Sequence, residues 1–281
     1  AGRRARGIGA RAMSVRLHVE VAGAGPDLAL IHGWGLNARV WDRAARRLAA
    51  SFTLHAVDLP GHGESPRVPG ALDAWIDALA EALPPAHVLG WSLGAQLALA
   101  LAARRPQAVR SLVLVAATPR FVAGGDWPWG VDPEALARVA ADVAADPRAA
   151  LKRFLALQAQ GDAAAREVTR VLRGCRAQRP LASAQALVEA LALLRDNDLR
   201  ADAGAVSAPA LVLQGARDPL VPAAAGRWLA QALAHGRLEA FGSAAHAPFV
   251  SAEAEFADTV SSFVNGVEHR NDDKQRRHAA R

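Results

Sequence analysis

The sequence His87-Val88-Leu89-Gly90-Trp91-Ser92-Leu93-Gly94 decides the fold, because a buried strand runs directly into a serine flanked by glycines. The segment that follows, 95–103, is rich in alanine and leucine and predicts a helix. Residues 90–94 match the pattern G-x-S-x-G, in which a strained strand-to-helix turn holds the serine hydroxyl clear of the sheet. The pattern alone is weak, but the strand before it and the helix after it support it. We therefore predict that Ser92 is a nucleophile; the alternative is an ordinary turn with an exposed serine.

Short apolar runs recur along the chain and alternate with helical patterns. The runs lie at 28–31, 53–57, 112–116 and 210–214, with a further strand expected at 238–241. Such runs are typical of strands buried on both faces of a parallel sheet. Helical patterns at 40–50 and 72–82 separate them, and the alternating residues 15–21 predict a half-buried first strand. This order predicts an α/β protein with a mostly parallel, doubly wound sheet, and the turn at Ser92 indicates the α/β-hydrolase fold.

The pattern changes between residues 119 and 200, where no convincing strand is found. Helical patterns occur there at 133–145, 147–160, 163–173 and 183–194. We interpret 119–200 as a helical cap inserted into an α/β-hydrolase core that comprises 13–118 and 201–267. The two ends, 1–12 and 268–281, are predicted to be disordered tails.

A serine nucleophile needs two partners, which the chain supplies in the expected order. A histidine must take the hydroxyl proton, and a carboxylate must hold that histidine in the correct tautomer. In this fold the chain order is serine, acid, histidine. Asp218 follows the 210–214 strand and His246 follows the 238–241 strand, so both lie on loops that leave strand ends. We predict a catalytic triad of Ser92, Asp218 and His246.

Other candidate residues fit this order less well. His235 is expected at the end of a helix, and His18 lies within the first strand. Asp196 and Asp198 precede the strand that should carry the acid. Cys175, in a helical segment without a nearby histidine, is expected to be inert.

The tetrahedral intermediate of such an enzyme needs two N–H donors for its oxyanion. In this arrangement they come from the residue after the nucleophile and from the loop after an early strand. Leu93 and Trp34 occupy these places, and His32-Gly33 is expected to shape the loop. We predict that both main-chain amides form the oxyanion hole and that no metal is needed, because the histidine and the amides supply the activation.

The charge of the chain does not by itself indicate a nucleic-acid partner. The net charge is +6, but only Lys152 and Lys274 are lysines, so 31 of the 33 basic residues are arginines. Together with the abundant alanine, this is typical of a compositional bias, and no recognised nucleic-acid-binding motif is found. We expect no nucleic-acid partner.

Cysteine content and hydropathy bear on the compartment. The single cysteine, Cys175, excludes an intramolecular disulfide and a cysteine-based zinc cluster. No run reaches the roughly 18 apolar residues that a membrane span needs. We expect a cytoplasmic protein with no membrane partner, and a monomer.

A further set of segments is more specific than the hydrolase motifs. Leu30-Ile31-His32-Gly33-Trp34-Gly35-Leu36-Asn37 is followed downstream by Arg153-Phe154-Leu155-Ala156-Leu157-Gln158 and by Ala244-Ala245-His246-Ala247-Pro248-Phe249. With the segment around Ser92, these resemble, in order across roughly residues 15–265, the pimeloyl-[acyl-carrier protein] methyl ester esterases of biotin synthesis. The resemblance implies hydrolysis of the methyl ester of pimeloyl-[acyl-carrier protein] to release methanol, with no cofactor.

The same resemblance implies a role for the cap. Cap arginines of the family hold the acidic carrier, and Arg153, Arg166 and Arg170 fall at matching places. From Arg148 to Arg179 the chain has eight basic residues and two acidic ones. One position that is basic in the family is Ala149 here. The resemblance also implies that the acyl channel is lined by Trp34, Trp91, Leu93, Phe154 and Gln158.

Alternatives remain open at this point. Arginine bias alone would place many arginines on any solvated helix. Phe154 and Trp91 would also fit a purely structural core. The chain could be a general short-chain carboxylesterase or lactonase, or a catalytically inactive hydrolase fold that serves as a binding module, although the complete triad argues against the last.

Overall fold

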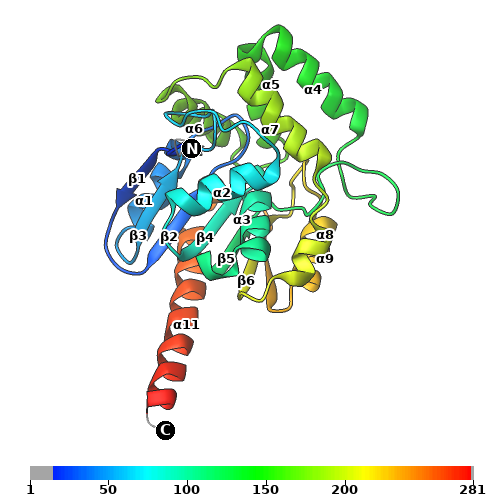
Figure 1. Ribbon diagram of the computed structural model, residues 1–281. Helices are drawn as coiled ribbons and strands as arrows, with labels where there is room; N and C mark the ends of the chain where they lie inside the picture. The colour runs from blue at the N-terminus through cyan, green and yellow to red at the C-terminus, as the bar shows by residue number, and fades with distance from the viewer. Residues whose placement is uncertain (1–14, 280–281) are drawn as a thin grey trace, which may run out of the picture.

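The computed structural model describes residues 15–279, and within this range seven strands form one sheet with helices on both faces (Figure 1). The strands are β1 (Val19–Ala22), β2 (Asp27–Ile31), β3 (Thr53–Val57), β4 (Ala86–Trp91), β5 (Val109–Val115), β6 (Ala210–Gly215) and β7 (Gly236–Phe241). Their order in the sheet is β1-β3-β2-β4-β5-β6-β7. Only the β1–β3 pair among these is antiparallel, so the carboxyl ends of the other six strands meet at one edge. The predicted fold class is confirmed.

Two layers of helices cover the sheet. The helices outside the cap are η1 (Ala38–Trp41), α1 (Asp42–Leu48), α2 (Leu72–Ala82), α3 (Leu93–Arg104), η2 (Pro106–Ala108), α8 (Arg200–Ala205), α9 (Ala223–Ala232), α10 (Pro248–Ser251) and α11 (Glu253–Ala279). α1, α10 and α11 pack together in one layer, whereas α2, α3, α8 and α9 form the other. No helix in residues 15–279 is long and apolar enough to cross a membrane.

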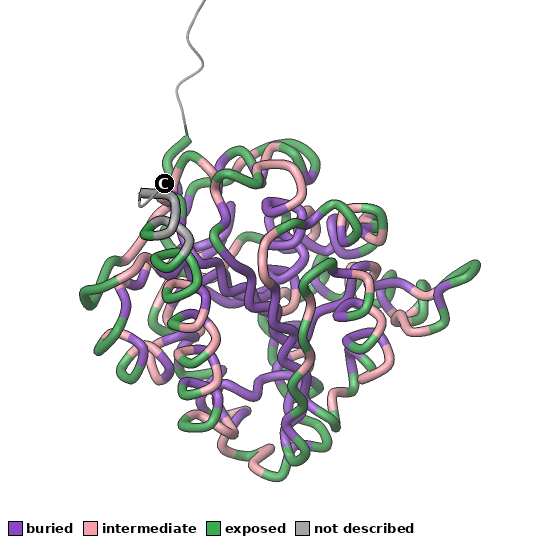
Figure 2. The backbone as a smooth tube through the Cα atoms, turned by 90° about the horizontal axis from the view of Figure 1, so that it is seen from below, coloured by how far each residue is buried: buried purple, intermediate pink, exposed green. Residues whose placement is uncertain are grey.

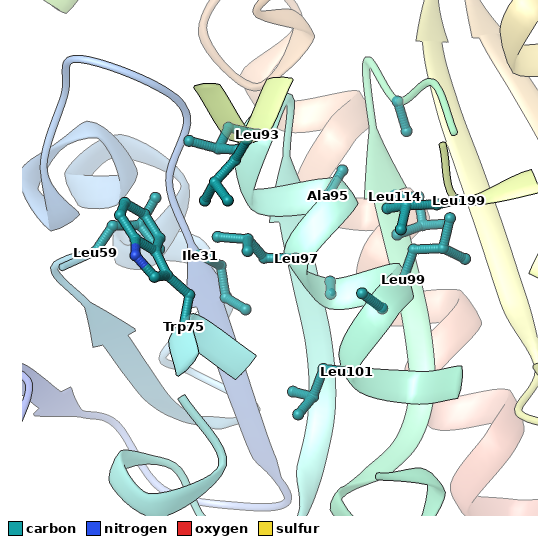
Figure 3. Close-up of a cluster of buried hydrophobic side chains, with 14 of the residues drawn as sticks. Ile31, Leu59, Trp75, Leu93, Ala95, Leu97, Leu99, Leu101, Leu114 and Leu199 are labelled. Carbon is teal, nitrogen blue, oxygen red and sulfur yellow. The ribbon is translucent and has the colours of Figure 1, made fainter. Parts of the chain in front are cut away.

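The helix α3, which follows the motif serine, lies at the centre of the core. Leu93 and Leu97 face Ile31, whereas Leu99 lies beside Leu114 on the other side of the helix (Figure 3). Buried residues are concentrated along the central strands, and exposed residues lie on the outer helices (Figure 2). Such dense packing on all sides fixes where α3 begins, and therefore where Ser92 stands.

Helices α4 to α7 gather at the end of the sheet opposite to the projecting end of α11 (Figure 1). They are α4 (Pro133–Ala145), α5 (Pro147–Gln158), α6 (Ala165–Ala177) and α7 (Ala184–Asp196). Asp132, Asp146 and Ser183 cap α4, α5 and α7 by accepting hydrogen bonds from first-turn amides. Within 119–200 the structure has isolated bridges but no strand, as the sequence predicted. The division of the chain at residues 119 and 200 stays a prediction.

The ends of the chain differ from the sequence prediction. β1 begins at Val19 rather than residue 15, because Val19 already pairs with Val57, the last residue of β3. The predicted disordered tail 268–281 is helical as far as Ala279, where α11 ends. Glu268 bonds the buried His87, with 3.1 Å between the Oε1 and Nε2 atoms, and this contact joins the start of the segment to the core. The predicted tail 1–12 lies outside the described residues.

Candidate active site

Ser92 sits in a strained turn between β4 and α3. Its φ of 56° and ψ of −116° are rare for a residue with a side chain, and such a conformation costs about 1–3 kcal/mol. A Cβ atom at Gly90 would lie 2.3 Å from the Gly94 carbonyl oxygen, and one at Gly94 would lie 2.3 Å from the Ile31 oxygen. Only glycine fits at both positions. The sequence pattern thus corresponds to the sharp turn that it predicts.

His246 and Asp218 meet in a buried pair. His246 Nδ1 and Asp218 Oδ2 are 2.8 Å apart, and both side chains are fully buried. The other carboxylate oxygen, Oδ1, accepts hydrogen bonds from the Leu220 and Val221 amides at 2.9 and 3.0 Å. The carboxylate is therefore held in one orientation, and it fixes the imidazole with the proton on Nδ1.

The main chain and the second ring nitrogen of His246 complete this arrangement. The Trp91 Nε1–H donates to the His246 carbonyl oxygen at 2.7 Å, and the two rings lie 5.6 Å apart between centroids. Because Trp91 directly precedes Ser92, this bond ties the histidine to the serine turn. His246 Nε2 is buried and has no hydrogen-bond partner among residues 15–279. A neutral Nε2 is an acceptor that can take a proton.

The loop after β2 is held by two buried histidines. His32 Nδ1 contacts the Gly33 carbonyl oxygen at 2.8 Å, and its Nε2 accepts the Leu59 N–H at 2.9 Å. His62 Nε2 accepts the Gly35 N–H at 3.3 Å, and its Nδ1 contacts the Pro60 oxygen at 3.0 Å. Both imidazoles must therefore be neutral and carry the proton on Nδ1.

Burial keeps these two histidines neutral. Neither ring is accessible to solvent, and desolvation lowers the pKa of His32 and of His62 to about 4. The two rings lie 5.6 Å apart, so each charge would also disfavour the other. The expected shaping role of His32-Gly33 thus has a structural basis, and His62 is a second support that the sequence analysis missed.

The predicted oxyanion-hole residues lie at the start of α3 and in the loop after β2. Leu93 is the first residue of α3, so its N–H has no acceptor within the helix. The Trp34 N–H also has no hydrogen bond within the described part of the chain. A Cβ atom at Gly33 would lie 3.4 Å from the Ser92 Cβ, which shows how closely the loop approaches the serine.

Four of the five residues expected to line an acyl channel lie between the core and the cap, whereas Trp91 is buried in the core against Trp41 and Phe249. The rings of Trp34 and Phe154 pack edge to face with 4.8 Å between centroids, and Trp34 Nε1–H donates to the Leu187 oxygen of α7 at 2.9 Å. Leu93 is completely buried in the same cluster. Gln158 is buried at the end of α5, and its Oε1 has no partner among residues 15–279. The structure therefore brings these four predicted residues to the interface of core and cap.

The three predicted docking arginines are exposed on the cap, but they differ in their partners. Arg153 pairs with Asp142 of α4 at 2.5 Å. Arg170 pairs with Glu167 at 2.7 Å, and Glu167 also binds Arg43 of α1. Arg166, one turn before Arg170 on α6, makes no ion pair with any described residue. Two of the three charges are thus partly neutralised within the cap.

Cys175 lies in α6 away from the triad residues. It is buried, and desolvation raises the pKa of its thiol to about 11. A thiol with this pKa stays protonated at neutral pH, which agrees with the expectation that it is inert.

Two further polar residues support the site and were not identified from the sequence. Gln214, at the end of β6, donates from Nε2 to the Val221 oxygen at 2.8 Å and lies 3.4 Å from Asp218 Oδ2. Asp162, between α5 and α6, accepts the Ala245 N–H at 2.8 Å. For Gln214, the sequence signal is its position four residues before Asp218. Asp162 lies 83 residues before its partner Ala245, so no local pattern could indicate its role.

The comparisons with known proteins agree with this architecture. The family described as alpha/beta hydrolase fold matches residues 28–253. Among solved structures, an esterase from Exiguobacterium antarcticum superposes with a TM-score of 0.80 at 23% identity, covering 89% of this chain and 95% of that one. An enol-lactonase from Burkholderia xenovorans gives 0.77 at 24%, covering 89% and 96%. These likenesses show the fold, and the chain is an α/β hydrolase.

Sequence relatives identify the chain more narrowly. A pimeloyl-[acyl-carrier protein] methyl ester esterase from Chromobacterium violaceum is 46% identical over 89% of this chain and 98% of that protein. One from Stenotrophomonas maltophilia is 44% identical over 89% and 97%. The chain belongs to this family of serine carboxylesterases, as the resemblance predicted.

Proposed function

We propose that this chain hydrolyses the methyl ester of pimeloyl-[acyl-carrier protein] in biotin synthesis, with Ser92, His246 and Asp218 as its catalytic triad. The observation that carries the chemistry is the buried His246–Asp218 pair: the His246 Nε2 atom has no partner among the described residues, and the His246 main-chain oxygen is bonded to Trp91, which directly precedes Ser92. The substrate follows from the names of relatives that align over nearly their whole length.

The same groups act in both halves of the reaction. Ser92 Oγ attacks the ester carbonyl carbon while His246 Nε2 takes its proton, and Asp218 stabilises the imidazolium. The Leu93 and Trp34 amides stabilise the oxyanion. The tetrahedral intermediate expels methanol, which leaves with the proton from His246. Water then attacks the acyl-enzyme in the same manner and releases the free pimeloyl carboxylate on its carrier.

The cap supplies the proposed substrate contacts. Phe154 and Gln158 of α5, with Trp34 and Leu93 of the core, line the acyl chain where core and cap meet. Arg153, Arg166 and Arg170 bind the acidic carrier. Arg166 is the most available of the three, since Arg153 and Arg170 must first exchange Asp142 and Glu167 for groups of the carrier. We place the enzyme in the cytoplasm as a monomer, without a nucleic-acid partner.

Ser92→Ala tests the nucleophile. The variant should lose more than 99% of esterase activity, since removing a triad member costs roughly 10⁴–10⁶-fold in kcat. The measurement is hydrolysis of a free short-chain ester, together with labelling by a fluorophosphonate. Retained labelling or activity would refute Ser92 as the nucleophile.

The substrate is tested with matched charge reversals. Wild type should prefer the pimeloyl-carrier methyl ester over a free short-chain ester, and Arg166→Glu/Arg170→Glu should abolish that preference while leaving free-ester hydrolysis intact. Arg227→Glu/Arg237→Glu is the control, because both residues are exposed outside the cap and the charge change is the same. Equal rates for the two substrates in wild type would leave a general carboxylesterase.

A further inference from the structure

The turn between α5 and α6, residues 159–164, connects the cap to the loop that carries His246. We call residues 242–247 the histidine loop. The Ala163 N–H donates to the Ser243 oxygen at 3.0 Å, and the His246 N–H donates to the Gln158 oxygen at 3.2 Å. The Ala245 N–H donates to Asp162 Oδ2 at 2.8 Å. Three hydrogen bonds therefore hold three residues of one short loop.

Asp162 is the only one of these acceptors that uses a side chain. It is 7% exposed, and its Oδ1 also accepts the Ala164 N–H at 2.7 Å, within the turn itself. Ala245 is completely buried, and the Asp162 carboxylate is the hydrogen-bond partner of its N–H among the described residues. Hydrogen bonds to a carboxylate are also stronger than neutral ones. Asp162 thus joins its own turn to the residue that precedes His246.

The same turn contacts the loop that carries Asp218. Gly161 has a φ of +86°, and a Cβ atom there would lie 3.1 Å from the Arg217 carbonyl oxygen. The Arg217 N–H donates to the Ala244 oxygen at 3.0 Å. The turn therefore packs where the loop of Asp218, residues 216–222, meets the histidine loop. A displacement of the turn would displace both loops.

We propose that Asp162 is a positioning residue that couples the cap to the catalytic histidine. This rests on the proposed function, because it takes His246 as the general base. α5 and α6 carry the proposed docking arginines. The turn between them holds the main chain of the histidine loop in position through hydrogen bonds. The Asp162–Ala245 bond therefore helps to hold His246 in place relative to α5 and α6.

Two substitutions separate this role from local capping. Asp162→Ser keeps a short acceptor for the Ala164 N–H but cannot reach Ala245. Asp162→Asn keeps the side-chain volume and therefore the packing of the turn. The asparagine amide has only one acceptor oxygen, so it cannot satisfy both the Ala164 and the Ala245 N–H groups. Asp146→Ser is the matched control: Asp146 accepts the Arg148 and Ala149 amides at the start of α5 and has no hydrogen bond to the histidine loop.

The primary measurement is kcat and KM on a free short-chain ester, per active site titrated with a fluorophosphonate. We expect Asp162→Ser and Asp162→Asn to lower kcat per titrated site by about 10- to 100-fold, as misplacement by about 1 Å does, with little change in KM. Asp146→Ser should stay within about twofold of wild type, because it leaves the histidine loop in place. Loss of thermal stability with kcat per site unchanged would overturn the proposal and leave Asp162 a structural residue.

Hydrogen exchange of peptides that cover the histidine loop is the second measurement. Exchange should accelerate in both Asp162 variants and not in Asp146→Ser; unchanged exchange would overturn the proposal. The result does not depend on the carrier as substrate. If wild type shows no carrier preference, or if Ser92→Ala keeps its labelling, the proposed function fails, whereas the coupling is still decided by exchange and by free-ester kcat per mole of protein.

Discussion

At the scale of single residues, the structure of the site depends on the protonation state of two imidazoles. His32 and His62 each use Nε2 as an acceptor for a main-chain N–H, from Leu59 and Gly35. A proton on Nε2 would turn the acceptor into a donor facing another donor, and a buried charge would have to be solvated by protein. The loop that carries Trp34 is therefore stable only while both rings are neutral.

This predicts a loss of stability in weak acid. The pKa of each histidine is about 4 in the folded protein and about 6.5 in the unfolded chain, so between these values the unfolded chain binds more protons. The free energy of unfolding therefore falls as the pH drops from 6.5 towards 4, by on the order of 3 kcal/mol for each histidine. His62→Gln, whose amide oxygen can accept the Gly35 N–H without titrating, should remove about 3 kcal/mol of this dependence. Urea unfolding from pH 7.5 to 4.5 measures it.

The matched control for this prediction is His269→Gln. His269 is exposed on α11 and bonds only the Asn265 oxygen of its own helix. Its replacement should leave the pH dependence as in wild type. The same slope in wild type and His62→Gln would show that the buried imidazole is not what makes the protein acid-sensitive.

At the scale of elements, α11 combines a buried part and a projecting part. Val264 and Val267 are the last buried side chains among those of α11 that the structure describes, and beyond them Glu268 bonds His87. His87 is itself buried, with its Nδ1 2.7 Å from Ser111 Oγ, and burial lowers its pKa whereas Glu268 opposes that shift. The Glu268–His87 bond therefore joins the projecting part to the core.

Deleting residues 268–281 should cost little. The core contacts of α11 remain, and the lost hydrogen bond, to a carboxylate that is 29% exposed, is worth about 1 kcal/mol after screening. Catalysis should be unchanged, because the segment projects from the end of the sheet opposite the cap. Thermal melting and free-ester kcat of the truncated chain are the measurements. A stability loss of several kcal/mol would mean that the segment contributes much more than the Glu268–His87 bond.

Elements with local signals were predictable from the sequence, whereas those defined by distant partners were not. α4 has the predicted range 133–145, because Asp132-Pro133 is a strong helix start. The pairing of Asp218 with His246 followed from motif order, since the fold brings strand ends together. The contact between Glu268 and His87 joins residues that are 181 positions apart, and no local pattern contains that information.

At the scale of the whole molecule, the relevant features are the positive net charge and the position of the cap helices at one end of the sheet. The net charge is +6, and the cap lies at one end of the sheet, so an acidic carrier would meet α5 and α6 before it meets the core. Several cap arginines are already paired, which limits short-range attraction. We therefore expect the net field of the molecule to act mainly on the rate of encounter.

This leads to a prediction about salt. Because the Debye length falls from about 10 Å at 0.1 M to about 3 Å at 1 M ionic strength, kcat/KM for the pimeloyl-carrier methyl ester should fall about tenfold over that range. A neutral short-chain ester has no charge to steer, so its kcat/KM should stay constant. Arg166→Glu/Arg170→Glu should remove most of the salt dependence, whereas Arg227→Glu/Arg237→Glu should keep it. Parallel salt dependence for both substrates would mean that salt acts on the enzyme itself, and that the cap does not recruit the carrier by charge.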